Sequence, residues 1–120
     1  MRATLVKSFR FEAAHFVPTF PAGHPCARMH GHSYKIEVVI EGEVDPAKGY
    51  VIDFRDIKRA YKPVEEELDH RMLNDIPGLE IPTSEVLSKW IYDRLKPSLP
   101  LLKTIRVFET ATSYVEYHGE

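Results

Sequence analysis

The side chains best suited to chemistry lie between residues 15 and 32: His15, Cys26, His30 and His32. His30 and His32 are two residues apart, and residues two apart on a strand project to the same face, so both imidazoles can bind one metal ion. His15 follows an apolar alternation in a neighbouring segment and is expected to supply a third nitrogen. Three histidine ligands leave one coordination position open, which is typical of catalytic zinc.

The spacing leaves two roles open for Cys26, which precedes His30 by four residues. It can be a fourth ligand that closes a structural zinc site. Alternatively, it can be a thiolate beside an open site, with its pKa lowered by nearby positive charge such as Arg28 or His24, and take a proton from carbon. Zinc is favoured over iron because no carboxylate stands at a matching position, although three histidines also suit other divalent ions.

Two further places in the sequence carry candidate chemistry. Asp69 and His70 end a predicted helix. There His70 either interacts favourably with the helix dipole or shuttles protons while a carboxylate orients its ring. Glu109 shares the inward parity of Ile105 and Val107, so a carboxylate ends a row of buried apolar side chains and needs a partner. That partner is either a salt bridge or a ligand with two parallel N–H donors.

Strands must position the histidines. Apolar residues alternate from Thr4 to Phe16 and again from His32 to Ile40, which predicts two half-buried strands. The segment from Val17 to Arg28 holds several prolines and is expected to be a loop. Two final strands are predicted from Leu101 to Ala111 and from Tyr114 to Tyr117.

Two helices are expected between these strand pairs. Asp53 is a candidate N-cap for a helix from about Phe54 to Leu68, which Pro63 should kink or divide. Thr83 is a candidate N-cap for a second helix that ends before Pro97. Its predicted apolar stripe is Val86, Leu87, Trp90, Ile91 and Leu95. The order of elements predicts an α+β fold, in which two helices cover one face of a four-stranded antiparallel sheet.

Composition narrows the function classes. The 120 residues are 43% hydrophobic, which predicts one domain over residues 1–120. A net charge of −2 without long single-sign blocks argues against a nucleic-acid or membrane surface and favours a small-molecule partner. The N-terminus lacks the apolar core of a signal peptide, so we expect a cytoplasmic protein. Edge strands in so small a sheet favour a homo-oligomer.

Several segments together resemble the 6-pyruvoyltetrahydropterin synthase family, and within it the bacterial branch that serves queuosine synthesis. The matching segments are Phe11–His15, Cys26–His32, Leu68–His70, Leu73–Glu80, Pro82–Glu85 and Glu109–Thr110. The resemblance implies a tunnelling fold, in which ββααββ subunits associate into barrels with active sites between them. The Cys-x-x-x-His-Gly-His spacing favours the carboxy branch, because a pyruvoyl synthase usually has a longer insert there.

The resemblance also implies an activity, that of a carbon–oxygen lyase. The zinc-dependent reaction would convert 7,8-dihydroneopterin triphosphate to 6-carboxy-5,6,7,8-tetrahydropterin, acetaldehyde and triphosphate. The alternatives are a pyruvoyl synthase, which eliminates triphosphate and rearranges the side chain, and a non-catalytic zinc or pterin-binding module.

The resemblance assigns roles residue by residue. Zinc, one ion per subunit, would be held by His15, His30 and His32. Cys26 would be the base, His70 with Asp69 its relay, and Glu109 the anchor of the pterin ring. Thr83, Ser84 and Glu85 match a segment near the pterin pocket, although Thr83 is also explained as a helix cap. Arg28 is a candidate for binding the triphosphate without a sequence signature.

Overall fold

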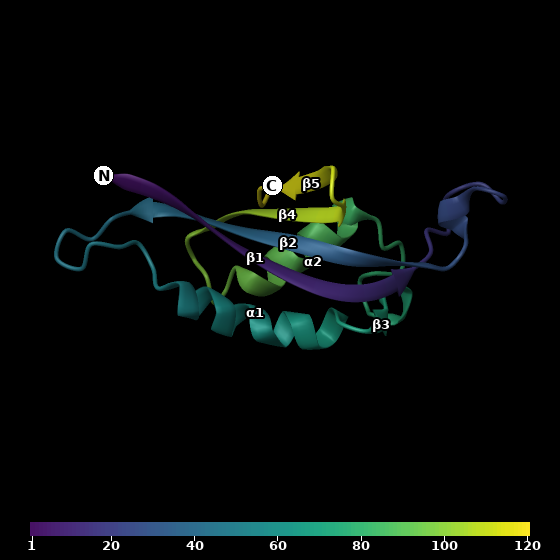
Figure 1. Ribbon diagram of the computed structural model, residues 1–120, viewed down its shortest axis with the longest axis horizontal. Helices are drawn as coiled ribbons and strands as arrows, with labels where there is room; N and C mark the ends of the chain where they lie inside the picture. Colours follow the sequence, from purple (N-terminus) through teal and green to yellow (C-terminus); the bar gives the residue numbers. More distant parts are fainter.

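The computed structural model describes all residues from 1 to 120 and is built around one long hairpin (Figure 1). β1 (Arg2–His15) and β2 (His30–Glu43) pair antiparallel along their whole length. Both strands extend beyond the predicted alternation at their polar ends. There Arg2 and Lys103 form ion pairs with the carboxylate of Glu41, a stabilisation that hydrophobic periodicity does not register.

The sheet has five strands in the order β3-β1-β2-β4-β5, and the prediction of four antiparallel strands is wrong in this detail. β4 (Leu102–Thr110) pairs antiparallel with β2, and β5 (Ser113–Tyr117) pairs antiparallel with β4. The added strand β3 (Arg71–Met72) pairs parallel with β1, so the sheet is mixed. Two residues are too few to show a period, which is why the sequence did not predict it.

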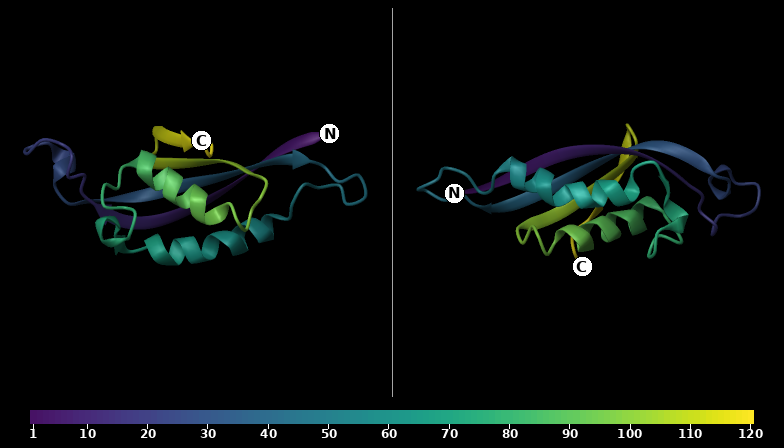
Figure 2. Two further views of the ribbon diagram at one scale, coloured as in Figure 1. Left: turned by 180° about the vertical axis from the view of Figure 1, so that it is seen from behind. Right: turned by 90° about the horizontal axis from the view of Figure 1, so that it is seen from below.

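Two helices lie on the same face of the sheet, as predicted (Figure 2). α1 (Phe54–Leu68) begins at Asp53, whose side chain accepts a hydrogen bond from Arg55 N–H, and it continues undivided through Pro63. α2 (Ser84–Leu95) begins at Thr83, whose hydroxyl accepts from Val86 N–H. The predicted stripe of α2 is wrong at Val86, which is 37% exposed; Ser88 and Tyr92 are buried beside Leu87 instead.

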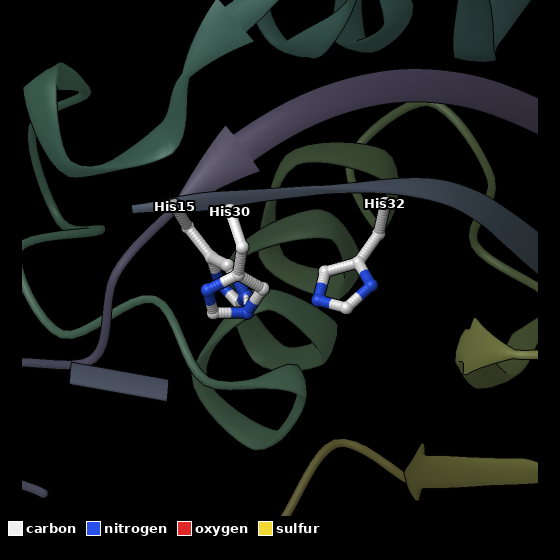
Figure 3. A group of neighbouring side chains, drawn as sticks. All are labelled: His15, His30 and His32. Carbon is white, nitrogen blue, oxygen red and sulfur yellow. Dashed lines mark hydrogen bonds between the residues drawn. The ribbon is translucent and has the colours of Figure 1, made fainter. Parts of the chain in front are cut away.

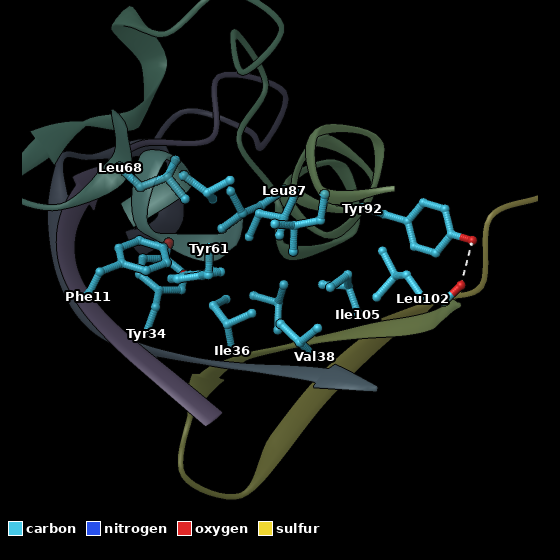
Figure 4. Packing of buried hydrophobic residues seen from close by; sticks show 14 of the residues in the cluster. Phe11, Tyr34, Ile36, Val38, Tyr61, Leu68, Leu87, Tyr92, Leu102 and Ile105 are labelled. Carbon is cyan, nitrogen blue, oxygen red and sulfur yellow. Dashed lines mark hydrogen bonds between the residues drawn. The ribbon is translucent and has the colours of Figure 1, made fainter. Parts of the chain in front are cut away.

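Between the helices and the sheet lies a core to which β1, β2, β4 and both helices contribute (Figure 4). Its fully buried members include Tyr34, Ile36, Ile57, Leu68, Leu87, Ile91 and Ile105. Such packing fixes the sheet rigidly against the helices, so side chains at the strand ends have defined positions. Neither helix has the length and apolar content that spanning a bilayer requires.

The loop between β1 and β2 is irregular, as predicted, apart from a short 3-10 turn, η1 (Pro25–Ala27). Val17 N–H donates to the carbonyl of Cys26 over 2.8 Å, which closes the loop at its base. This hydrogen bond holds Cys26 close to the end of β1, which carries His15. A second 3-10 turn, η2 (Leu73–Asp75), follows β3.

Replacing Tyr61 by phenylalanine is expected to raise the free energy of unfolding by about 1 kcal/mol. The Tyr61 ring stacks on Phe9 with centroids 4.0 Å apart, but its hydroxyl is buried without a hydrogen-bond partner. Phenylalanine keeps the stacking and removes the unpaired group. Urea unfolding measures the change, with Tyr92→Phe as control: that hydroxyl donates to the carbonyl of Leu102, so its removal should not stabilise the protein. An unchanged or lower stability of Tyr61→Phe would contradict the expectation.

Candidate functional site

Three histidines converge at the end of the β1–β2 hairpin, as the spacing predicted (Figure 3). The register places His15 opposite His30, and His32 opposite Ala13, so all three side chains lie on the face that packs against the helices. One ligand nitrogen from each ring lies within 4.8 Å of the other two. The Nε2 atoms of His15 and His30 are 3.1 Å apart. This grouping is suited to a metal ion.

Backbone carbonyls orient two of the three rings. His15 Nδ1 lies 2.8 Å from the carbonyl of Pro82, and His30 Nδ1 lies 2.7 Å from the carbonyl of Arg28. A carbonyl only accepts hydrogen bonds, so each Nδ1 donates and each Nε2 of the neutral ring carries a lone pair. Two lone pairs then face each other across 3.1 Å, an arrangement that a cation relieves. Hydrogen bonds of this kind are the usual support of metal-binding histidines.

Burial favours the neutral, metal-binding form of His15 and His32. The His15 side chain is 1% exposed, and burial lowers its pKa despite the hydrogen bond to Pro82. Burial also lowers the pKa of His32. The Nε2 atom of His32 is buried without a hydrogen-bond partner, which is costly for a polar atom unless a ligand satisfies it. The donor set therefore fits a metal ion.

Glu109 points inward from β4, as its parity predicted, and meets the histidine cluster. Its Oε1 lies 3.4 Å from His15 Nε2 and 3.6 Å from His32 Nε2. The Glu109 side chain is 34% exposed, so its carboxylate lies at the boundary between the cluster and solvent. A negative charge in this place strengthens the preference of the site for a cation.

A cavity of about 190 Å³ adjoins Glu109. It brings together three of the predicted ligand-binding residues, Ser84, Glu85 and Glu109, with Val107 and Tyr114 among its other lining residues. Four of its seven lining residues are polar, so it offers convergent polar groups that can fix the orientation of a small molecule. Thr83 does not line this cavity, and its hydroxyl serves as the N-cap of α2.

Cys26 is a free, half-buried thiol in η1, outside the group of three histidines. Its backbone N–H donates to His24 Nδ1 over 3.0 Å, while the His24 ring stacks on Phe20. Arg28 is exposed, and its side chain forms no ion pair. The structure thus places Cys26 near the strand end but gives Arg28 no contact that defines a role.

Asp69 and His70 do contact each other, a point that the sequence left undecided. His70 Nδ1 lies 3.0 Å from Asp69 Oδ2, and Asp69 Oδ1 accepts from Glu12 N–H over 2.9 Å. These hydrogen bonds, first the one from Glu12, lower the pKa of Asp69. His70 adopts a left-handed backbone conformation with φ 59°, and its N–H donates to the carbonyl of Glu12. A carboxylate therefore orients an imidazole that is 77% exposed.

His70 forms no hydrogen bond with the histidine cluster but shares a cavity with one of its members, His32. It lines a cavity of about 580 Å³ with His32 and Met29, and with Glu12, Ser33 and other residues of the outward parity of β1 and β2. No hydrogen bond joins His70 to the three clustered histidines. The outward exposure of its ring suits a group that meets a molecule beyond its own chain.

Sequence reasoning missed two residues that support the cluster. Pro82 supplies the carbonyl that orients His15, and no side-chain pattern encodes a backbone carbonyl. The Tyr34 hydroxyl lies 3.3 Å from His15 Nδ1, and the residue is fully buried. Tyr34 follows His32 by two residues and has the same parity, so the alternation could have predicted its position beneath the cluster.

Known proteins are similar to this chain in sequence and in fold. A 6-carboxy-5,6,7,8-tetrahydropterin synthase from Synechocystis sp. is 39% identical over 119 residues, which cover 94% of this chain and 91% of that protein. A dihydroneopterin monophosphate aldolase from Pyrococcus furiosus is 40% identical over 100 residues, covering 83% of this chain and 81% of its own. The alignments thus span most of each protein.

A solved structure agrees with the fold. The Caenorhabditis elegans 6-pyruvoyl tetrahydropterin synthase superposes with a TM-score of 0.91 at 26% identity, covering 100% of this chain and 97% of that one. The α+β arrangement is therefore a tunnelling fold, and the expectation of a pterin-processing enzyme is confirmed at the level of the family. Because the family model for 6-pyruvoyl tetrahydropterin synthase matches residues 4–120, this chain belongs to that family.

Proposed function

We propose that this protein is a zinc-dependent 6-carboxy-5,6,7,8-tetrahydropterin synthase. It would convert 7,8-dihydroneopterin triphosphate and water to 6-carboxy-5,6,7,8-tetrahydropterin, acetaldehyde and triphosphate. Loss of triphosphate breaks a carbon–oxygen bond, and release of acetaldehyde breaks a carbon–carbon bond. The observation that carries the proposal is the inward Glu109 carboxylate beside three converging histidines, in a chain 39% identical to a protein of this name.

His15, His30 and His32 would hold the zinc ion. Bound zinc would supply Lewis-acid stabilisation of negative charge on the side-chain oxygens of the substrate. The Pro82 and Arg28 carbonyls fix two of the rings with Nε2 free, so the site needs little rearrangement to bind a metal. Glu109 lies beside the histidines, so the lack of a carboxylate no longer separates zinc from iron. Zinc is proposed because three histidines with one open position are typical of catalytic zinc sites.

Glu109 would hold the pterin ring. Its carboxylate can accept two parallel hydrogen bonds from the amino and ring N–H groups of the pterin edge. The cavity that Glu109 shares with Ser84 and Glu85 would receive that ring. Orientation by a bidentate contact places the side chain of the substrate toward the histidines and lowers the entropic part of the barrier.

Cys26 would act as the base that takes a proton from a side-chain carbon of the substrate. His70, oriented by Asp69, would relay protons. Because the His70 ring is exposed and forms no hydrogen bond with the cluster, we propose that it completes the site of a second copy of this chain. The open edge of β5, and the part of β1 that lies beyond its short pairing with β3 at Ala13 and Ala14, support such a homo-oligomer.

Product analysis tests the proposal. Zinc-loaded protein incubated with 7,8-dihydroneopterin triphosphate should release acetaldehyde, triphosphate and the carboxy product in equal amounts. Triphosphate without acetaldehyde would instead indicate a pyruvoyl synthase, the activity named for the Caenorhabditis elegans structure. Dihydroneopterin monophosphate serves as the second substrate, because cleavage to a phosphorylated two-carbon aldehyde would indicate an aldolase like the Pyrococcus furiosus protein. We further propose that the carboxy product feeds synthesis of queuosine, a 7-deazapurine.

A further inference from the structure

Glu109 has two sets of neighbours, and only one is explained by pterin binding. On one side its carboxylate lines the cavity with Ser84 and Glu85. On the other side its Oε1 lies 3.4 Å from His15 Nε2 and 3.6 Å from His32 Nε2. The ion pairs of Glu109 are with these two histidines alone, since no lysine or arginine lies within ion-pair distance. Its contact with the cluster therefore needs an explanation of its own.

A hydrogen bond does not explain the contact with His15. Its Nδ1–H already donates to the Pro82 carbonyl, so the Nε2 that faces Glu109 carries a lone pair in the neutral ring. A carboxylate oxygen is also an acceptor, and two acceptors at 3.4 Å repel each other. A cation between them turns that repulsion into attraction. The position of Glu109 is thus that of a metal ligand.

Three of the donor-atom spacings agree with this assignment. Four ligands at about 2.0–2.1 Å from a tetrahedral zinc ion are about 3.3 Å from one another. The Nε2 atoms of His15 and His30 are 3.1 Å apart, and Glu109 Oε1 lies 3.4 Å from His15 Nε2 and 3.6 Å from His32 Nε2. Glu109 is not within ion-pair distance of His30, so its carboxylate must turn toward that ring to complete the site. The carboxylate stands next to the end of β4, and its partial exposure leaves it free to turn toward either neighbour.

We propose that Glu109 is an exchangeable fourth ligand of the metal. In the pterin-free protein its carboxylate completes a three-histidine, one-glutamate site. The N–H edge of an incoming pterin then draws the carboxylate away, which opens the coordination position for the side-chain oxygens of the substrate. Substrate binding is thereby coupled to opening of the metal site, and a closed site excludes competing ligands when no pterin is present. The inference rests on the proposed metal and pterin sites.

Cobalt substitution tests the proposal without any measurement of turnover. Metal-free protein is titrated with Co²⁺ against a chelator, and the visible d–d absorption reports the ligand set. Without pterin, Glu109→Gln and Glu109→Ala should bind Co²⁺ at least about tenfold more weakly than the wild type, with altered absorption. Glu116→Gln is the matched control, because this carboxylate lies on β5 and contacts Arg106 without contacting the clustered histidines. Thermal melts of the metal-free variants establish that they fold.

A second arm follows the exchange in the wild-type protein. Saturating unsubstituted pterin, which has the N–H edge but no side-chain oxygens, should shift the Co²⁺ spectrum and weaken Co²⁺ binding relative to the pterin-free protein. Wild-type affinity and absorption in both Glu109 variants, or a spectrum indifferent to pterin, would overturn the assignment. Acetaldehyde production is a separate result, so the lyase proposal survives the failure of this one, and the converse also holds.

Discussion

Replacing Cys26 by alanine is expected to lower turnover by about 10²- to 10⁴-fold while the protein keeps its metal. The thiolate is proposed to remove a proton from carbon, and alanine offers no group for that step. The thiol lies outside the group of three histidines, so metal binding does not depend on it. The backbone contacts of Cys26, with His24 and Val17, are kept by alanine, so η1 should retain its structure.

Metal analysis beside steady-state kinetics checks this expectation. Zinc content is measured by mass spectrometry on wild type, Cys26→Ala and Cys26→Ser, with thermal melts to compare folding. Zinc retained with turnover lost supports a base. Loss of zinc from Cys26→Ala would make the thiol a fourth ligand and would remove the open-site model. Serine, a much weaker base, should resemble alanine in rate.

Replacing His32 by alanine is expected to reduce bound zinc from about one ion per chain to less than about a tenth, and to abolish turnover with it. The variant is informative because the Nε2 atom of His32 is buried without a hydrogen-bond partner from the protein. Removing an unpaired buried polar atom costs no hydrogen bond, so the metal-free variant should melt no more than a few degrees below the wild type. Loss of zinc would then reflect loss of a ligand and not unfolding.

His118→Ala is the matched control for this variant. The His118 ring is hydrogen-bonded to the hydroxyl of Thr104 and lies near Glu116, away from the cluster. It should keep the zinc content and turnover of the wild type. Full zinc occupancy in His32→Ala would contradict the three-histidine site.

The long strands and the helices followed from local patterns, whereas β3 did not. The amphipathic run with its Asp53 cap gave both ends of α1, because capping and periodicity agree there. β3 is defined by contacts across the chain, where Asp69 and His70 bond the backbone of Glu12. Such long-range contacts leave no periodic signal in a two-residue segment.

The candidate site divides in the same way. Strand parity predicted that His15, His30 and His32 face one side and that Glu109 points inward, because a side chain alternates with the pleat. Parity could not predict that Glu109 contacts the histidines, since that depends on the register between β2 and β4. The carbonyl that orients His15 belongs to the backbone of Pro82, far away in the sequence. Every residue has a backbone carbonyl, so the residue types could not predict this contact.

A zinc titration tests most directly the central claim that the protein is a zinc-dependent lyase. Zinc is added back to metal-free protein, and the release of acetaldehyde from 7,8-dihydroneopterin triphosphate is followed. Acetaldehyde should be absent without zinc, rise in proportion to added zinc, and reach a plateau at about one ion per chain. Acetaldehyde release at the same rate without zinc, or none at full zinc occupancy, would contradict the account.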